Sequence, residues 1–304
     1  MNKRIQKGFT LIEVSIVILI MGLLLTGGLV TMFATSERGK TTQTAANLAN
    51  IQDALAIFLA MNGRLPCPAG LSQTQDSSAF GIEQTSGSNP MACNTASGLF
   101  SGTTGGETQY YGMVPVRTLG LSDASAIDGF GNRIVYVVQN AFVNNATTNT
   151  SCVTLGTSAL NSSATANLCY RGQASPSTGG GGGTGGLVIA DASGNTISTD
   201  AVYVLISYGA NGYGAYISNS GSGAALQNGL PLPNSIYANE YDNLNCNPTT
   251  FVCSSSGVNN VFVQATTTNT FDDIVYFETR NNLLTKCNKY AANACFIRHG
   301  ITIQ

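Results

Sequence analysis

Eight cysteines are the residues best equipped for covalent or metal chemistry in this sequence of 304 residues. Their number is even and all lie beyond the N-terminal apolar segment, which indicates export to an oxidising compartment and a set of disulfides. Zinc is the alternative, because Cys295 and His299 have a Cys-x3-His spacing with Cys287 nearby, but a fourth ligand is not evident. Pairing each cysteine with its neighbour in sequence predicts disulfides between Cys67 and Cys93, Cys152 and Cys169, Cys246 and Cys253, and Cys287 and Cys295.

Oxygen-bearing side chains alternate in the segment "DASGNTISTD", residues 191–200. This pattern is similar to a calcium-binding loop, which takes its ligands from carboxylates, amides and carbonyls. The same residues also suit an ordinary turn between two strands, and the loop lacks a second carboxylate close to the first. Calcium is the one cofactor that the sequence suggests, and its candidate ligands are Asp191, Ser193, Asn195 and Asp200.

A catalytic site needs convergent acids, bases or nucleophiles, and the chain offers a single histidine, His299. The sequence has no Gly-x-Ser-x-Gly, His-Glu-x-x-His or Walker pattern. Carboxylates occur in pairs at Asp272 with Asp273 and at Asp123 with Asp128, where we expect solvated turns or strand ends. A net charge of −2 gives no electrostatic footprint for nucleic acid. We therefore expect neither an enzyme nor a nucleic-acid-binding protein.

The element that comes first in the chain is an apolar stretch, residues 9–34, which contains one acid, Glu13. As a helix rising ~1.5 Å per residue it is long enough to span a bilayer. Lys3, Arg4 and Lys7 precede it and orient the N-terminus toward the cytoplasm. An ordinary cleaved signal peptide has a shorter apolar region that ends at a small-residue cleavage site. A plain signal anchor leaves Glu13 unexplained, because a charge at the centre of a membrane helix costs about 2.5–3.5 kcal/mol.

The stretch "KGFTLIEVSIVILIMGLL" resembles the signal of type IV pilins and of the pseudopilins of type II secretion. The resemblance lies in a short basic leader that ends at Gly8, then Phe9, then an acid at the fifth position after the glycine. It implies that a prepilin peptidase cuts between Gly8 and Phe9 and that the new amino group of Phe9 is N-methylated. A buried carboxylate is tolerable beside a cation, so Glu13 would pair with the N-terminus of a neighbouring subunit and set the axial register.

A second, amphipathic half of the helix is predicted over residues 36–62, closed by an Asn-Gly pair. Leu48, Ile51, Leu55 and Phe58 fall at steps of three and four residues and form one apolar stripe. Such a stripe would pack the helix onto the rest of the chain.

Residues 63–304 alternate apolar runs with turn residues, as β structure does. The glycine-rich segment 175–186 is expected to be a loop, which either divides this head into two lobes or, as we prefer, forms a long hairpin loop. The predicted strands are residues 133–138, 186–190, 201–208, 260–265 and 272–278. The expected fold class is therefore α+β: after a cleaved leader, residues 1–8, a long helix, residues 9–62, packs on a β-rich, disulfide-containing head. The half of the helix at residues 9–34 is expected to be transmembrane.

Five head segments also resemble segments of large pilin-like proteins, in the same order: "LPCPAG", "GMVPVRTLGL", "DGFGNRIVYVV", "SYGANGYGAY" and "FDDIVYF". The resemblance implies a structural subunit of the inner membrane with a periplasmic head. This subunit would join other pilin or pseudopilin subunits in a helical filament through an inner-membrane assembly platform. The large head favours a minor or specialised pilin with an adhesive or initiating role. The alternatives are a minor pseudopilin of a type II secretion piston and a membrane-anchored binding protein that never polymerises.

Overall fold

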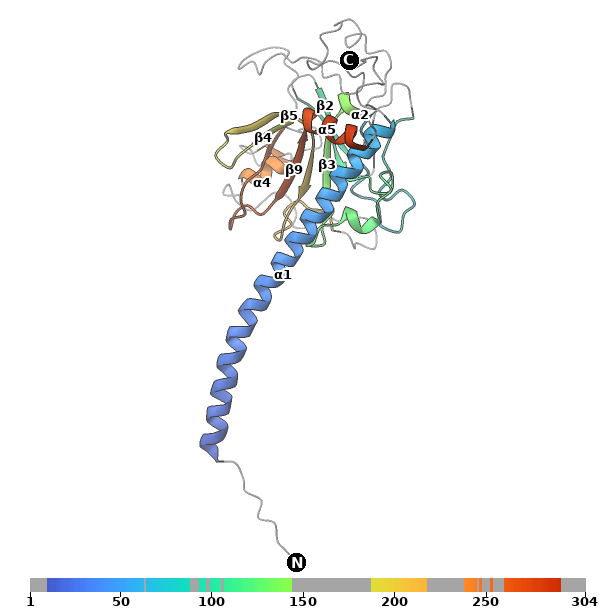
Figure 1. The fold of residues 1–304 in the computed structure, drawn as a ribbon. Coiled ribbons are helices and arrows are strands. Elements are labelled where there is room, and N and C mark those ends of the chain that lie inside the picture. The colour runs from blue at the N-terminus through green and yellow to red at the C-terminus, as the bar shows by residue number, and fades with distance from the viewer. Residues whose placement is uncertain are drawn as a thin grey trace, which may run out of the picture.

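Helix α1, Leu11–Asn62, is the longest element of the structure, a computed structural model. Its 52 residues extend over about 80 Å at ~1.5 Å per residue. Figure 1 shows its N-terminal half projecting as a rod, while its C-terminal part lies along a β-rich head. Among the described residues, we find no helical segment whose length and hydropathy together meet the requirements of a membrane span. The described residues are 10–62, 64–87, 93–96, 99–104, 107–143, 187–217, 238–244, 246–247, 252–253 and 260–290. Among these, the description leaves out the side chains of residues 24–35, 103–104, 107, 141, 238, 246–247, 252–253, 280–281, 284 and 288.

The C-terminal half of α1 buries one face against the head. Leu48, Ile51 and Leu55 of the predicted stripe are fully buried. Phe58, the fourth predicted member, is only half-buried. The stripe continues through Leu59, which is 2 % exposed, because a step of four residues from Leu55 returns to the same helix face.

The head is built on one curled, mostly antiparallel sheet. Its strand order is β1-β2-β3-β5-β4-β8, β9 also pairs with β5, and only β4 and β8 are parallel neighbours. The strands are β1 Phe100–Thr104, β2 Glu107–Met113, β3 Val135–Gln139, β4 Leu187–Ala190, β5 Thr196–Ser207, β8 Val261–Val263 and β9 Ile274–Thr279.

Strand β5 organises this sheet, because its 12 residues are enough to pair with three other strands. Strands β3 and β9 both pair with the second half of β5, and β4 pairs with its first half. The pairings of β4 and of β9 both reach Ala201. The second half of β5 and all of β3 are buried, which accounts for their continuous apolar sequences.

Short elements complete the head around the sheet. Helix α5 follows β9 directly and packs against α1. The small sheet joins β6 and β7 as antiparallel partners. The bounds of these elements are η1 Asp123–Ala126, α2 Asn140–Val143, α4 Ala238–Asn243, β6 Cys246–Asn247, β7 Val252–Cys253 and α5 Arg280–Tyr290.

A strand of the structure overlaps each of the five predicted ones, but β1 and β2 were not predicted. Their sequences, "FSGTT" and "ETQYYGM", carry glycine and polar residues that obscure the β pattern. Strand β5 begins at Thr196, earlier than predicted, because its polar first half pairs with β4. The glycine-rich segment 175–186 lies outside the described residues. The nearest described strands on its two sides, β3 and β4, belong to one sheet and are separated by β5.

Cys67 and Cys93 form a disulfide, the first of the four pairs expected from the sequence. Cys246 and Cys253 are directly opposite each other in β6 and β7, but their side chains lie outside the described residues, so their pairing stays a prediction. Cys287 is buried in α5 and is disulfide-bonded. Its expected partner Cys295, like Cys152 and Cys169, lies outside the part of the chain that is described.

Candidate functional site

Glu13 caps the start of α1. Its carboxylate accepts hydrogen bonds from the backbone N–H and the hydroxyl of Thr10, each at 3.2 Å. The Thr10 hydroxyl oxygen in turn accepts the Glu13 N–H at 3.4 Å. This reciprocal arrangement is a capping box, Thr-x-x-Glu, which satisfies N–H groups that a helix start leaves unpaired. Sequence reasoning missed Thr10, although the four-residue pattern is visible in the sequence. Gly8 and Phe9 lie outside the described residues.

The first three turns of α1 expose apolar side chains all round the helix. The large aliphatic side chains of residues 11–23 range from 47 % exposed at Val14 to 89 % at Leu11. Figure 1 shows this part of the rod well away from the head. An apolar surface of this extent is typical of a site that binds another protein or a membrane.

The rod is fixed to the head at the turn "DGFGN". The Gly129 N–H donates to the Thr44 hydroxyl at 2.9 Å, and the Asn47 side-chain amide donates to the Ile127 carbonyl at 2.8 Å. A Cβ at residue 129 would lie 2.1 Å from the carbonyl oxygen of Lys40, so only glycine allows α1 to approach the turn this closely. We call this contact the turn joint.

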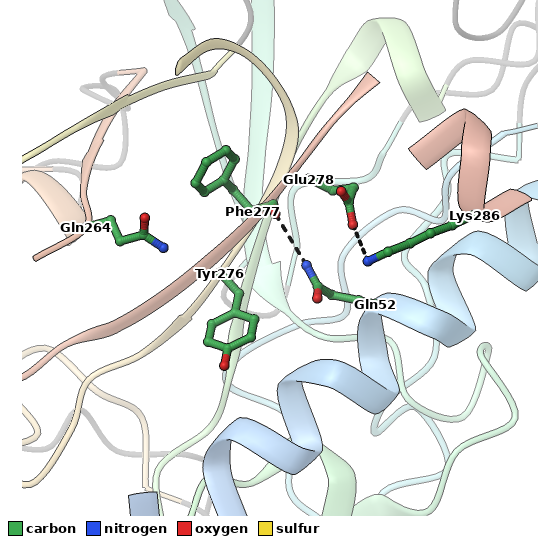
Figure 2. A pocket seen from close by; sticks show the side chains of 6 residues that line it. All are labelled: Gln52, Gln264, Tyr276, Phe277, Glu278 and Lys286. Atoms are coloured by element: carbon green, nitrogen blue, oxygen red, sulfur yellow. Dashed lines mark hydrogen bonds and ion pairs between the residues drawn. The ribbon is translucent and has the colours of Figure 1, made fainter. Parts of the chain in front are cut away.

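A second contact between rod and head lies further along α1, around a small open pocket (Figure 2). Gln52 of α1 donates from its amide to the Phe277 carbonyl of β9 at 3.3 Å. Lys286 of α5 forms an ion pair with Glu278 of β9. These polar groups hold α1, β9 and α5 together, so the pocket belongs to the attachment of the rod. It is lined by Gln52, Gln264, Tyr276, Phe277, Glu278 and Lys286.

Asp128, at the start of the turn joint, is 3 % exposed, so the solvated setting expected for it is wrong. One carboxylate oxygen accepts the backbone N–H groups of Phe130 and Asn132 at 2.9 and 2.8 Å. The other accepts the Ser207 hydroxyl at 2.6 Å. Burial nevertheless raises the pKa of Asp128, because desolvation outweighs these hydrogen bonds. The side chain ties the turn joint to the end of β5.

Three carboxylates meet beside the turn that follows β5. Glu240 of α4 and Asp272 and Asp273, just before β9, have oxygens that all lie within 4.8 Å of one another. We call them the acidic cluster. Glu240 and Asp273 are buried and Asp272 is half-buried. The aspartate pair therefore lies at a strand end, as expected, but the solvated setting expected for it is wrong. Sequence reasoning missed Glu240, because it is distant in sequence and only the fold brings it to the aspartates.

Amide groups donate to one oxygen of each carboxylate in the acidic cluster. Asn211 donates its backbone N–H to Asp272 and its side-chain amide to Glu240, both at 2.8 Å. Asn243 donates its side-chain amide to Asp273 at 2.8 Å. The second oxygens, Glu240 Oε2, Asp272 Oδ1 and Asp273 Oδ1, are buried and have no hydrogen-bond partner among the described residues.

The turn after β5 approaches the acidic cluster closely because Gly209 has a φ of +56°. A Cβ there would lie 2.3 Å from the Asp272 carbonyl oxygen, so no other residue fits without a shift. Burial raises the pKa of Glu240 to about 7, and the nearby charge of Asp272 contributes in the same direction. Burial also raises the pKa of Asp272, and it raises the pKa of Asp273 well above the usual range.

The calcium candidate of the sequence, residues 191–200, forms the turn between β4 and β5. The Asp191 carboxylate accepts the backbone N–H groups of Ser193 and Asn195 at 2.8 and 2.9 Å, and the Asn195 side-chain amide at 2.9 Å. These bonds, chiefly those from Asn195, lower the pKa of Asp191. Asp200 instead accepts the Ser198 hydroxyl at 2.7 Å. The structure thus brings the first three candidates together around a turn and gives the fourth a separate partner.

Comparison with known proteins concerns the start of the rod. Residues 3–29 match the prokaryotic N-terminal methylation motif. The chain carries the signal of type IV pilins and pseudopilins. A signal of this type implies processing by a prepilin peptidase and assembly with other pilin subunits in general. No curated protein and no solved structure matches the chain. The pilin signal therefore supports a pilin-like or pseudopilin protein, a structural class.

Proposed function

We propose that the chain is a structural subunit of a type IV pilus-like filament. The observation that carries the proposal is the first part of α1, which bears the methylation motif and exposes its apolar side chains over residues 11–23. Before assembly, residues 9–34 would anchor the chain in the inner membrane, with the N-terminus cytoplasmic and the head periplasmic. In the filament, the rods of neighbouring subunits would cover the same surface.

Processing prepares the rod for this assembly. The peptidase cuts between Gly8 and Phe9, and the new amino group of Phe9 is methylated. The capping box holds the Glu13 carboxylate at the start of the helix, where the amino group of a neighbouring subunit can pair with it. A carboxylate and an ammonium that meet in an apolar filament core compensate each other's desolvation, which neither does alone.

The head gives the subunit its specialised character. The head, residues 63–304, is much larger than the attachment of a rod requires. We therefore propose a minor pilin with an adhesive or initiating role. The turn joint and the contacts of Gln52 attach the rod to the head at two places. A pull on the rod during extraction from the membrane would therefore move the head with it.

The first test is mass spectrometry of the mature protein, made from the full-length chain in cells that produce it. We expect an N-terminus at Phe9 that carries a methyl group. An intact Met1 would refute the proposal, because the methylation motif would then not be used.

The second test follows Glu13→Gln into filaments, with Ser15→Ala as the matched control. Ser15 is exposed on the same turns of α1, where its hydroxyl bonds the Ile12 carbonyl at 2.8 Å. We expect Glu13→Gln to be processed normally, but its amount in the sheared filament fraction should fall at least about tenfold. Removing one partner of a buried ion pair costs more than the ~1.4 kcal/mol that changes an equilibrium tenfold. The Ser15→Ala control should assemble as the wild type does. Wild-type filament levels of Glu13→Gln would remove the assembly role of the acid.

A third variant, Thr10→Val, separates the two roles of Glu13. It deletes the cap hydroxyl and keeps the carboxylate. We expect a milder assembly loss than for Glu13→Gln. Equal losses would mean that Glu13 acts through the helix cap alone.

A further inference from the structure

We propose that the acidic cluster, Glu240, Asp272 and Asp273, binds a calcium ion that fastens α4 to the start of β9. The proposal concerns the head alone and is independent of filament assembly. It rests on three observations: the spacing of the carboxylates, their unpartnered oxygens and the absence of a cation partner among the described residues.

The spacing suits a single ion. Calcium lies ~2.3–2.6 Å from its oxygen ligands, so two ligands of one ion are at most about 5 Å apart. All three carboxylates offer oxygens within 4.8 Å of one another. One ion can therefore reach a residue of α4 and both residues before β9.

The unpartnered oxygens are the second observation. Glu240 is 1 % and Asp273 4 % exposed, and each has one oxygen that accepts no hydrogen bond. Asp272 has such an oxygen as well. A buried acceptor without a partner is unfavourable, because it has lost its hydrogen bonds to water. An ion held by these carboxylates would compensate for the hydrogen bonds to water that their buried oxygens have lost.

Charge is the third observation. The side-chain ion pairs found among the described residues are Arg64 with Glu83, Arg117 with Asp123 and Lys286 with Glu278, and none involves the cluster. The groups that donate to it are the neutral amides of Asn211 and Asn243 and neutral backbone N–H groups, and the carboxyl groups of Glu240 and Asp272 also contact each other. Adjacent buried carboxylates cannot all ionise without a compensating charge. Either protons or a cation must neutralise them.

Oxygen ligands alone favour a hard cation, and calcium fits better than magnesium. Calcium accepts several carboxylates in irregular geometry, whereas magnesium demands octahedral geometry and keeps most of its waters. Two of the three carboxylates are buried, which leaves little space for a hydrated ion. Asp272 is half-buried and leaves a side open for entry and for water ligands.

The acidic cluster is a better site than the turn at residues 191–200. In that turn, both oxygens of the Asp191 carboxylate already accept N–H groups, and the residue is partly exposed. An ion there would compete with the hydrogen bonds that close the turn. The two places thus provide matched variants for one experiment.

The experiment measures thermal unfolding and calcium binding of the purified full-length chain in detergent. The chain is first treated with EDTA and then titrated with calcium chloride or magnesium chloride. At a calcium concentration about 100 times its Kd, the ratio of folded to unfolded protein rises about 100-fold, which corresponds to an increase in Tm of about 5–10 °C. We expect this increase with calcium, a smaller one with magnesium, and one calcium per chain by titration calorimetry.

The variants Glu240→Gln and Asp273→Asn each remove a charge and keep the side-chain shape. We expect both to lose the calcium-induced increase in Tm, while Asp191→Asn keeps it. Without calcium, Glu240→Gln should unfold at the wild-type temperature or above it, because a buried charge has been removed.

Three results would overturn the proposal. The first is a wild-type chain that neither binds calcium nor changes its Tm, which would mean that protons neutralise the cluster. The second is an effect of calcium that survives in both cluster variants. The third is an effect abolished by Asp191→Asn alone, which would assign the ion to the β4–β5 turn.

Discussion

Replacing Gly129 by alanine tests how the rod is attached to the head. The new Cβ would lie 2.1 Å from the Lys40 carbonyl oxygen and 2.7 Å from two further backbone atoms of that residue. No side-chain rotation relieves a clash with backbone, so α1 and the turn must separate by about 1 Å to reach ordinary packing distance. That displacement breaks the hydrogen bond from Gly129 to Thr44, which is 2.9 Å long.

The expected loss of stability follows from these two terms. Overpacking costs about 1–3 kcal/mol and a lost hydrogen bond about 0.5–1.5 kcal/mol, so Gly129→Ala should destabilise the chain by about 2–4 kcal/mol. The Tm of the head, followed by near-ultraviolet circular dichroism of its tyrosines, should fall by about 5–10 °C.

Gly39→Ala is the matched control on the rod itself. A Cβ at residue 39 meets nothing within 4 Å, and alanine favours a helix over glycine by about 1 kcal/mol. This variant should be neutral or slightly stabilising. An unchanged Tm for Gly129→Ala would show that the close approach of rod and turn does not exist in solution.

Three further predictions concern the head and its contact with the rod. Leu55→Ala, at a fully buried position of α1, should destabilise the chain by about 2–5 kcal/mol in urea unfolding. Cys67→Ser should lower stability by about 3–4 kcal/mol in urea unfolding, because the disulfide with Cys93 closes a separation of 26 residues; Cys93→Ser removes the same bond, so a clearly different loss in that variant would contradict this cause. Arg117 lowers the pKa of Asp123 by a hydrogen bond, so this pair stabilises the fold above the unfolded-state pKa of the acid and loses that effect as pH falls through its lower folded-state value. Asp123→Asn should remove that acid dependence from the unfolding profile, and an unaltered profile would contradict it.

Local patterns in the sequence were enough to predict several parts of the structure. The spacing of Leu48, Ile51 and Leu55 predicted the buried face of α1, because a helix repeats every 3.6 residues wherever it occurs. The prediction was less accurate at Phe58. Steps of three and of four residues from Leu55 lead to Phe58 and to Leu59, and the head covers Leu59 more fully. Runs of β-branched residues likewise predicted the buried strands, whereas β1 and β2 depend on pairing with neighbours more than on their own sequences.

Among the site residues, too, some were visible in the sequence and others are brought together only by the fold. The aspartate pair at 272–273 was visible in the sequence, but its burial was not, because burial depends on what packs around the strand end. Asn211 and Glu240 reach these aspartates from other parts of the chain. Such contacts leave no periodic signal, so no local pattern could have predicted the acidic cluster.

The N-terminal signal can be recognised from the amino-acid sequence alone. The basic leader, the glycine at position 8, the acid five residues later and the apolar run all lie within one short continuous segment, which matches the methylation motif without reference to the rest of the fold. The contact of the rod with Gly129, the pairing of β5 with three strands and the proximity of the three carboxylates follow instead from the folded arrangement. The reason is physical: the signal acts through neighbours along the chain, while packing and charge act through neighbours in space.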